Sequence, residues 1–88
     1  MLEGHPNLAW LNLDNTRITN AAISSLATLP KLEWLHIGST KVNDEAVPQI
    51  LAIGSLKNLT VRLSGITDVG YRILDKEMTA RGGTAVGP

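Results

Sequence analysis

Hydrophobic residues recur along this chain in a pattern that repeats every 24 positions. The segment LAWLNL, residues 8–13, ends in an alternation of apolar and polar side chains, and LEWLHI, residues 32–37, repeats that order. A period of two residues is typical of a short β-strand with one buried face. A third segment, LKNLTV at 56–61, keeps its leucines in the same places. The sequence therefore predicts three short strands of similar structure.

Each predicted strand is followed by a polar turn and then by a segment whose apolar residues have helical spacing. Asn20, Asp44 and Asp68 open these segments, where a side-chain oxygen can cap free backbone N–H groups. Pro48 lies in the first turn of the second segment and leaves the exact start of that helix open. A repeated strand, turn and helix predicts parallel neighbouring strands joined by right-handed crossovers. The aligned apolar positions are Leu8, Leu32 and Leu56; Leu11, Leu35 and Leu59; Leu13, Ile37 and Val61; and Ile18, Val42 and Ile66.

These residues resemble the leucine-rich repeat family, whose units begin with the consensus L-x-x-L-x-L-x-x-N/C-x-L. The resemblance covers roughly residues 6–78, with Thr16, Thr40 and Ser64 at the consensus Asn or Cys position, a variant similar to bacterial and F-box-type repeats. It implies a short α/β solenoid with three parallel strands on its concave face and helices on its convex face. The three hydroxyl groups are expected to bond backbone groups of the turns, as the family's Asn does.

The two ends of the chain depart from the repeat. LEGHP, residues 2–6, aligns with the end of the first helical segment, which predicts a repeat domain over 1–78 that starts in the middle of a repeat. The third helical segment has Asp75 and Glu77 where the second has apolar residues, as is typical of a terminal capping unit. The segment TARGGTAVGP, residues 79–88, has three Gly, one Pro and little to bury, so we expect a flexible tail.

Composition narrows the possible functions further. The chain has no Phe, so its core must be built from Leu, Ile, Val and Ala. Eight basic residues balance eight acidic ones and are scattered, which disfavours nucleic acid or an anionic membrane as a partner. The absence of Cys excludes disulfides and cysteine metal sites. No apolar run reaches the roughly 20 residues of a membrane span, and the N-terminus lacks a signal peptide, which favours a cytoplasmic location.

The side chains between the inward-facing leucines are predicted to point to the concave face. Because adjacent parallel strands lie ~4.8 Å apart, Trp10 and Trp34 are predicted neighbours whose rings can stack. The tryptophans either shield the sheet or form an interaction hot spot with the polar groups beside them, and shielding is the commoner role. The candidate binding residues are Trp10, Asn12, Asp14, Trp34, His36, Asn58, Thr60 and Arg62.

Two rows across this face contain candidate ligand-binding or catalytic residues. Asp14, Gly38 and Arg62 align, and the glycine could leave a notch for a ligand group between two opposite charges, although an ordinary solvated row is the simpler interpretation. His36 has no second histidine or carboxylate in register, so it does not indicate a metal site. Thr60 beside it lacks the orienting group of an activated nucleophile. The sequence therefore predicts no catalytic residue, metal or cofactor.

The function that the resemblance implies is non-enzymatic protein–protein recognition through the concave face, which a regular array of exposed side chains permits. One alternative is a C-terminal capping fragment of a longer repeat protein, with a structural or self-associating role. An open N-terminal edge would then expose Leu8, Leu11 and Leu13 and favour a homo-oligomer. A further alternative is a regulatory appendage of an enzyme. No feature of the sequence identifies the protein partner.

Overall fold

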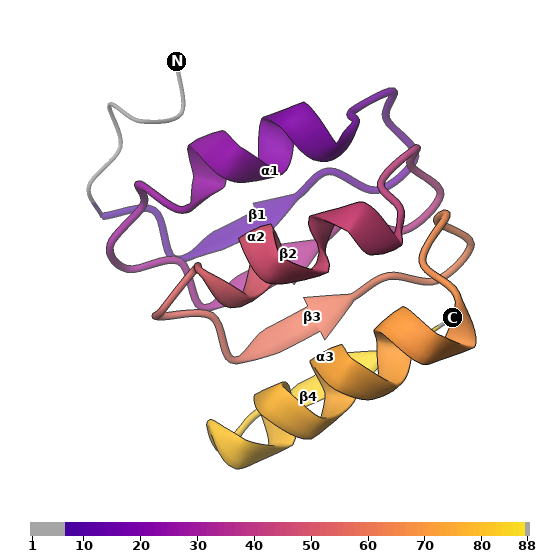
Figure 1. Cartoon of the computed structure of the whole chain (residues 1–88). Helices are drawn as coiled ribbons and strands as arrows, with labels where there is room; N and C mark the ends of the chain where they lie inside the picture. The colour runs from indigo at the N-terminus through magenta and orange to yellow at the C-terminus, as the bar shows by residue number, and fades with distance from the viewer. Residues whose placement is uncertain (1–6, 88) are drawn as a thin grey trace.

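The computed structural model describes residues 7–87 and shows a mixed α/β fold in which a parallel sheet is covered on one face by three helices (Figure 1). The strands lie in the order β1-β2-β3-β4, which is also their order along the chain. The predicted helical turn at 2–6 lies outside the described residues. The elements are β1 (Trp10–Asn12), α1 (Asn20–Leu26), β2 (Trp34–His36), the 3-10 helix η2 (Asp44–Ala46), α2 (Val47–Leu51), β3 (Asn58–Thr60), α3 (Asp68–Ala80) and β4 (Thr84–Val86).

The strand register and the core follow the hydrophobic pattern of the sequence. Parallel pairing places Trp10 beside Trp34 and Trp34 beside Asn58, so that positions 24 residues apart are neighbours. The middle residues of β2 and β3, Leu35 and Leu59, are almost fully buried beneath the helices. Leu, Ile and Val residues from the strands, turns and helices form one continuous core with them. The predicted inward direction of the leucines and the parallel pairing of the first three strands are confirmed.

The turns after β1, β2 and β3 share one hydrogen-bond pattern. A hydroxyl group spans each turn by donating to the carbonyl three residues earlier, which confirms that these side chains bond the turn backbone. The bonds are Thr16 Oγ1 to Leu13 O (2.7 Å), Thr40 Oγ1 to Ile37 O (2.7 Å) and Ser64 Oγ to Val61 O (2.6 Å). The residue before each hydroxyl has a left-handed backbone, with φ of 63° at Asn15, 53° at Ser39 and 60° at Leu63.

The prediction that Asn20, Asp44 and Asp68 cap helices is wrong in its geometry. Each is the first residue of a helix, and neither α1 nor α3 has a side-chain cap. The Asn20 amide instead donates to Asn43 Oδ1 at 2.7 Å, and Asp44 Oδ1 accepts the backbone N–H of Thr67 at 2.8 Å. Stacking of parallel units brings polar groups of the next turn within reach of these short side chains. Asn20 and Asp44 therefore connect adjacent units.

The segment 79–88, expected to be a flexible tail, contains the end of α3 and all of β4, which pairs with β3 and makes four strands instead of three within residues 7–87. Two glycines turn the chain from helix to strand. Gly82 has a φ of 86°, and the N–H of Gly83 donates to the Met78 carbonyl at 2.9 Å, as in a Schellman motif. A Cβ at Gly83 would lie 1.7 Å from the Lys57 carbonyl oxygen, so only glycine allows this close approach.

Arg81 links the end of α3 to α2 and to the segment that follows α2. Its guanidinium donates to the carbonyls of Leu51 at 2.7 Å, Ile53 at 2.8 Å and Leu56 at 3.1 Å. It also forms an ion pair of 2.9 Å with Glu77, one turn earlier in α3. Arg81 thus provides donors for the carbonyl of the last residue of α2 and for two carbonyls of the segment between α2 and β3.

Tyr71 forms a hydrogen bond to the backbone of the edge strand β4. Its hydroxyl donates to the Ala85 carbonyl at 3.0 Å. Burial, and to a smaller extent the nearby Asp75 carboxylate, raises the pKa of Tyr71. The phenol therefore stays protonated and able to donate at neutral pH, and it links α3 to the last strand.

The opposite edge of the sheet is open among residues 7–87, because β1 pairs with β2 alone. Apolar residues of β1 and of the segments next to it are only partly buried, whereas their counterparts 24 residues later lie in the core. These partly buried residues are Leu8, Leu11, Leu13 and Ile18. The core is therefore less completely covered at the N-terminal edge than at the C-terminal edge.

Candidate functional site

The sheet face away from the helices, which we call the open face, carries the predicted binding residues. Strand pairing aligns them in two rows, to which β4 adds Thr84 and Val86. Sequence reasoning missed these two because it treated their segment as a tail, although the RGG stretch at 81–83 was a signal for a helix end. The rows are Trp10, Trp34, Asn58 and Thr84, and Asn12, His36, Thr60 and Val86; Asp14 and Arg62 follow β1 and β3.

The two tryptophans are the largest apolar side chains of this face, which also carries Val86 and several polar groups. Trp10 is 53% exposed and Trp34 is 47% exposed. The predicted stacking of the two indoles does not occur among residues 7–87. The ring of Trp10 instead meets the imidazole of His36 edge to face, with centroids 5.6 Å apart and planes at 61°. Diagonal contacts of this kind are within reach of aromatic side chains on neighbouring strands. The indole faces therefore keep surface available for a partner.

Asp14 lies closer to His36 than the sequence pattern predicts. Its Oδ2 is 3.9 Å from His36 Nδ1, so a carboxylate does neighbour this histidine. Thr60 is the register partner of His36 on the next strand. Asp14, His36 and Thr60 have the residue types of an acid, a base and a hydroxyl nucleophile. However, 3.9 Å exceeds hydrogen-bonding distance, and no hydrogen bond joins His36 to Thr60 among residues 7–87. The geometry does not form a proton relay.

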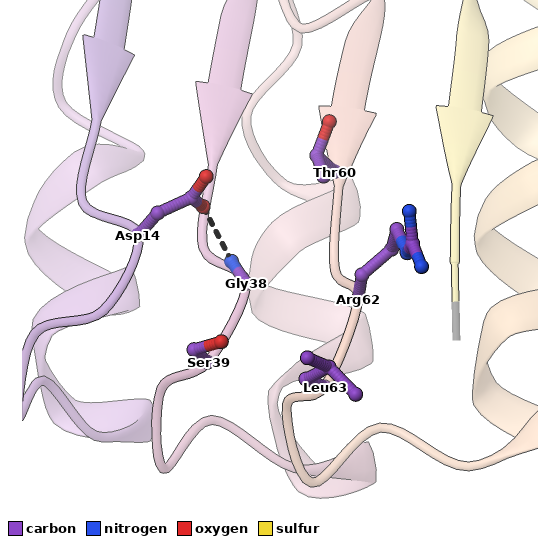
Figure 2. A pocket seen from close by; sticks show the side chains of 6 residues that line it. All are labelled: Asp14, Gly38, Ser39, Thr60, Arg62 and Leu63. Carbon is purple, nitrogen blue, oxygen red and sulfur yellow. Dashed lines mark hydrogen bonds between the residues drawn. The ribbon is translucent and has the colours of Figure 1, made fainter.

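A shallow depression of about 440 Å³ lies where β2 and β3 end (Figure 2). Asp14 Oδ1 accepts the backbone N–H of Gly38 at 2.7 Å on one side of it. A Cβ at Gly38 would lie 2.8 Å from the Arg62 carbonyl oxygen, so the close approach of the next turn requires glycine here. Arg62 extends toward β4, away from Asp14, and the two form no ion pair. The lining residues are Asp14, Gly38, Ser39, Thr60, Arg62 and Leu63.

The described residues offer no centre for a metal ion, because nowhere in 7–87 do three or more His, Cys, Asp or Glu side chains gather in one place. Over the same stretch, no helix has the length and apolar character needed to cross a bilayer. Fold and site together define a small α/β protein with an exposed aromatic and polar sheet face. Comparison with protein-family profiles and with curated proteins finds no match to this chain.

Proposed function

We propose that this chain is a non-enzymatic protein–protein interaction module that binds a protein partner through the open face. The carrying observation is the pair of half-exposed indoles, Trp10 and Trp34, on adjacent strands. Tryptophans bring large contact areas at low conformational cost and are enriched at interface hot spots. His36, Asn58 and Thr60 beside them are only partly buried and can supply hydrogen bonds at the rim.

We further propose that the fold is a short leucine-rich repeat solenoid. Two observations support this proposal. The 24-residue register of β1 to β3 makes equivalent sequence positions neighbours in the sheet. The three turns share one hydroxyl-to-carbonyl bond and one left-handed residue. In such an array the residues between the leucines form an extended binding surface, as proposed for the open face.

The test compares capture of partners by matched variants. Wild type, Trp34→Ala and Val69→Ala are immobilised, and bound proteins are quantified by mass spectrometry. Val69 is 69% exposed on α3, away from the sheet. The Val69→Ala substitution therefore removes apolar surface without changing the open face. We expect Trp34→Ala to lose partners that Val69→Ala retains, with both variants folded by circular dichroism. Equal capture by Trp34→Ala and wild type would show that the open face is not the binding surface.

A second candidate function is self-association through the β1 edge. The observation that favours it is the contrast between the two edges. Both edge strands pair on one side only among residues 7–87, but Tyr71 bonds the Ala85 carbonyl of β4, whereas the leucines at β1 are partly exposed. An unpaired strand edge next to apolar surface is a template for a further strand. Sedimentation should show a dimer that dissociates on dilution, and a monomer at every concentration would exclude this candidate.

A further inference from the structure

The depression next to Gly38 contains a backbone donor whose acceptor is missing. Gly38 donates its N–H to Asp14 Oδ1, and Arg62 occupies the position of Gly38 in the next unit. The Arg62 carbonyl accepts the N–H of Ser39, which lies on the Gly38 side. Gly38, the equivalent turn residue, directs both its N–H, to Asp14, and its C=O, which accepts from the Asn15 N–H, toward the preceding strand. By the same geometry the Arg62 N–H faces Gly38. Gly38 has no side chain to accept it, and among residues 7–87 this N–H has no partner.

Other donors around the depression are also unused. Neither the Thr60 hydroxyl, the Ser39 hydroxyl nor the Arg62 guanidinium donates to any of residues 7–87. The guanidinium is directed toward β4 in Figure 2 and is exposed, so it is free to turn over the depression. Leu63, at the rim, is 76% exposed although its φ of 60° is unfavourable for a leucine.

We propose that this depression binds a carboxylate of the protein partner, supplied by an acidic side chain or a C-terminus. The bound carboxylate accepts from the Arg62 N–H, as Asp14 Oδ1 accepts from Gly38, and its second oxygen accepts from Thr60 or the guanidinium. The proposal rests on the proposed binding function for the origin of its ligand. A backbone N–H together with an arginine is a strong, charge-assisted carboxylate site.

The charges of the depression favour a carboxylate over a phosphate. Arg62 is its single fixed cation, and Asp14 is an anion on the opposite side. Asp14 is 3.3 Å from the point where a Gly38 Cβ would stand, so a bound anion lies close to this carboxylate. Arg62 attracts an anion and Asp14 repels it, so a carboxylate with one negative charge is repelled less than the nearly doubly charged phosphate. The partner group is therefore a monoanion.

The test needs no partner protein. The full chain, labelled with ¹⁵N, is titrated with sodium acetate against sodium chloride at matched ionic strength, and amide shifts are followed by NMR. We expect a saturable shift of the Arg62 amide. Arg62→Gln should weaken acetate about tenfold, because a charged hydrogen bond is lost. Asp14→Asn keeps the oxygen that bonds Gly38 and removes the repulsion, so it should strengthen acetate about threefold. Arg72→Gln, on the exposed side of α3, should change nothing.

Three results would overturn the carboxylate site. They are no saturable shift at Arg62, an affinity that Arg62→Gln leaves unchanged, and tighter binding of inorganic phosphate than of acetate. Each of them can occur while Trp34→Ala still abolishes partner capture, in which case the proposed function stands and this inference fails. Acetate binding together with unchanged partner capture by Trp34→Ala supports the site and refutes the tryptophan pair as the binding surface.

Discussion

Replacement of Arg81 by alanine should destabilise the fold more than any other single change on its surface. The substitution leaves the carbonyls of Leu51, Ile53 and Leu56 without a charged donor. A hydrogen bond to a charged group contributes about 1.5–3 kcal/mol, and water replaces part of that at a partly accessible site. The Arg81 side chain is 19% exposed, so replacement by water is incomplete. We therefore expect a loss of about 3 kcal/mol in the free energy of unfolding.

Urea and thermal denaturation measure this loss. For a domain of this size, 1 kcal/mol lowers Tm by roughly 4–8 °C, so Arg81→Ala should lower Tm by about 12–24 °C. Arg81→Lys should recover less than half of the loss, because one ammonium group cannot match the guanidinium fork. Glu77→Ala is the matched control. It removes only the ion pair with Arg81, which is worth about 0.3–0.5 kcal/mol. The reasoning is refuted if Arg81→Ala costs under 1 kcal/mol or no more than Glu77→Ala.

Three further changes test other parts of the structure. Leu63→Gly should raise the free energy of unfolding by about 1 kcal/mol, because glycine adopts a positive φ without strain. A lower free energy of unfolding in urea denaturation would contradict this prediction. Gly83→Ala should lower the free energy of unfolding by about 2 kcal/mol and speed hydrogen exchange throughout β4, because the new Cβ clashes with the Lys57 carbonyl. Exchange in β4 at the wild-type rate would argue against that clash. Tyr71→Phe should cost about 1 kcal/mol at pH 7. Folding raises the pKa of Tyr71, so the stability that the protonated phenol provides is complete below its ordinary pKa of 10.0 and is lost as the pH rises through the folded value. The decrease of Tm at alkaline pH should therefore be smaller in Tyr71→Phe than in the wild type. An equal decrease in both proteins would contradict the raised pKa of Tyr71.

The sequence repeat predicts the first three strands well because their periodicity comes from burial. Leu35 and Leu59 must face the helices, and a shift of one residue would turn them to water. The fourth strand is hidden from this reasoning, since Thr84 pairs with Asn58 at a spacing of 26 residues and has no leucine pattern around it. Its position depends on a glycine turn and on close backbone approach, which leave no hydrophobic period.

Candidate residues on the open face were predictable from alternation, but their partners were not. The sequence places Trp10, Trp34 and His36 on one face, yet only the twisted sheet brings Trp10 to His36 instead of Trp34. The acceptor role of Asp14 toward Gly38 likewise depends on side-chain direction. The unpartnered N–H of Arg62 follows from a missing side chain, which pattern analysis does not register.

The two edges of the sheet are stabilised to different extents, so we expect unfolding to begin at one of them. Near the C-terminus, Arg81 and Tyr71 join α3 to α2 and β4, so opening there must break several strong bonds at once. At β1, the leucines are only half-buried, so this edge resists opening less. Local opening begins where the structure is least stable. A pulling force or a mild denaturant should therefore release the first unit early, while the last helix and strand survive as the final folded nucleus.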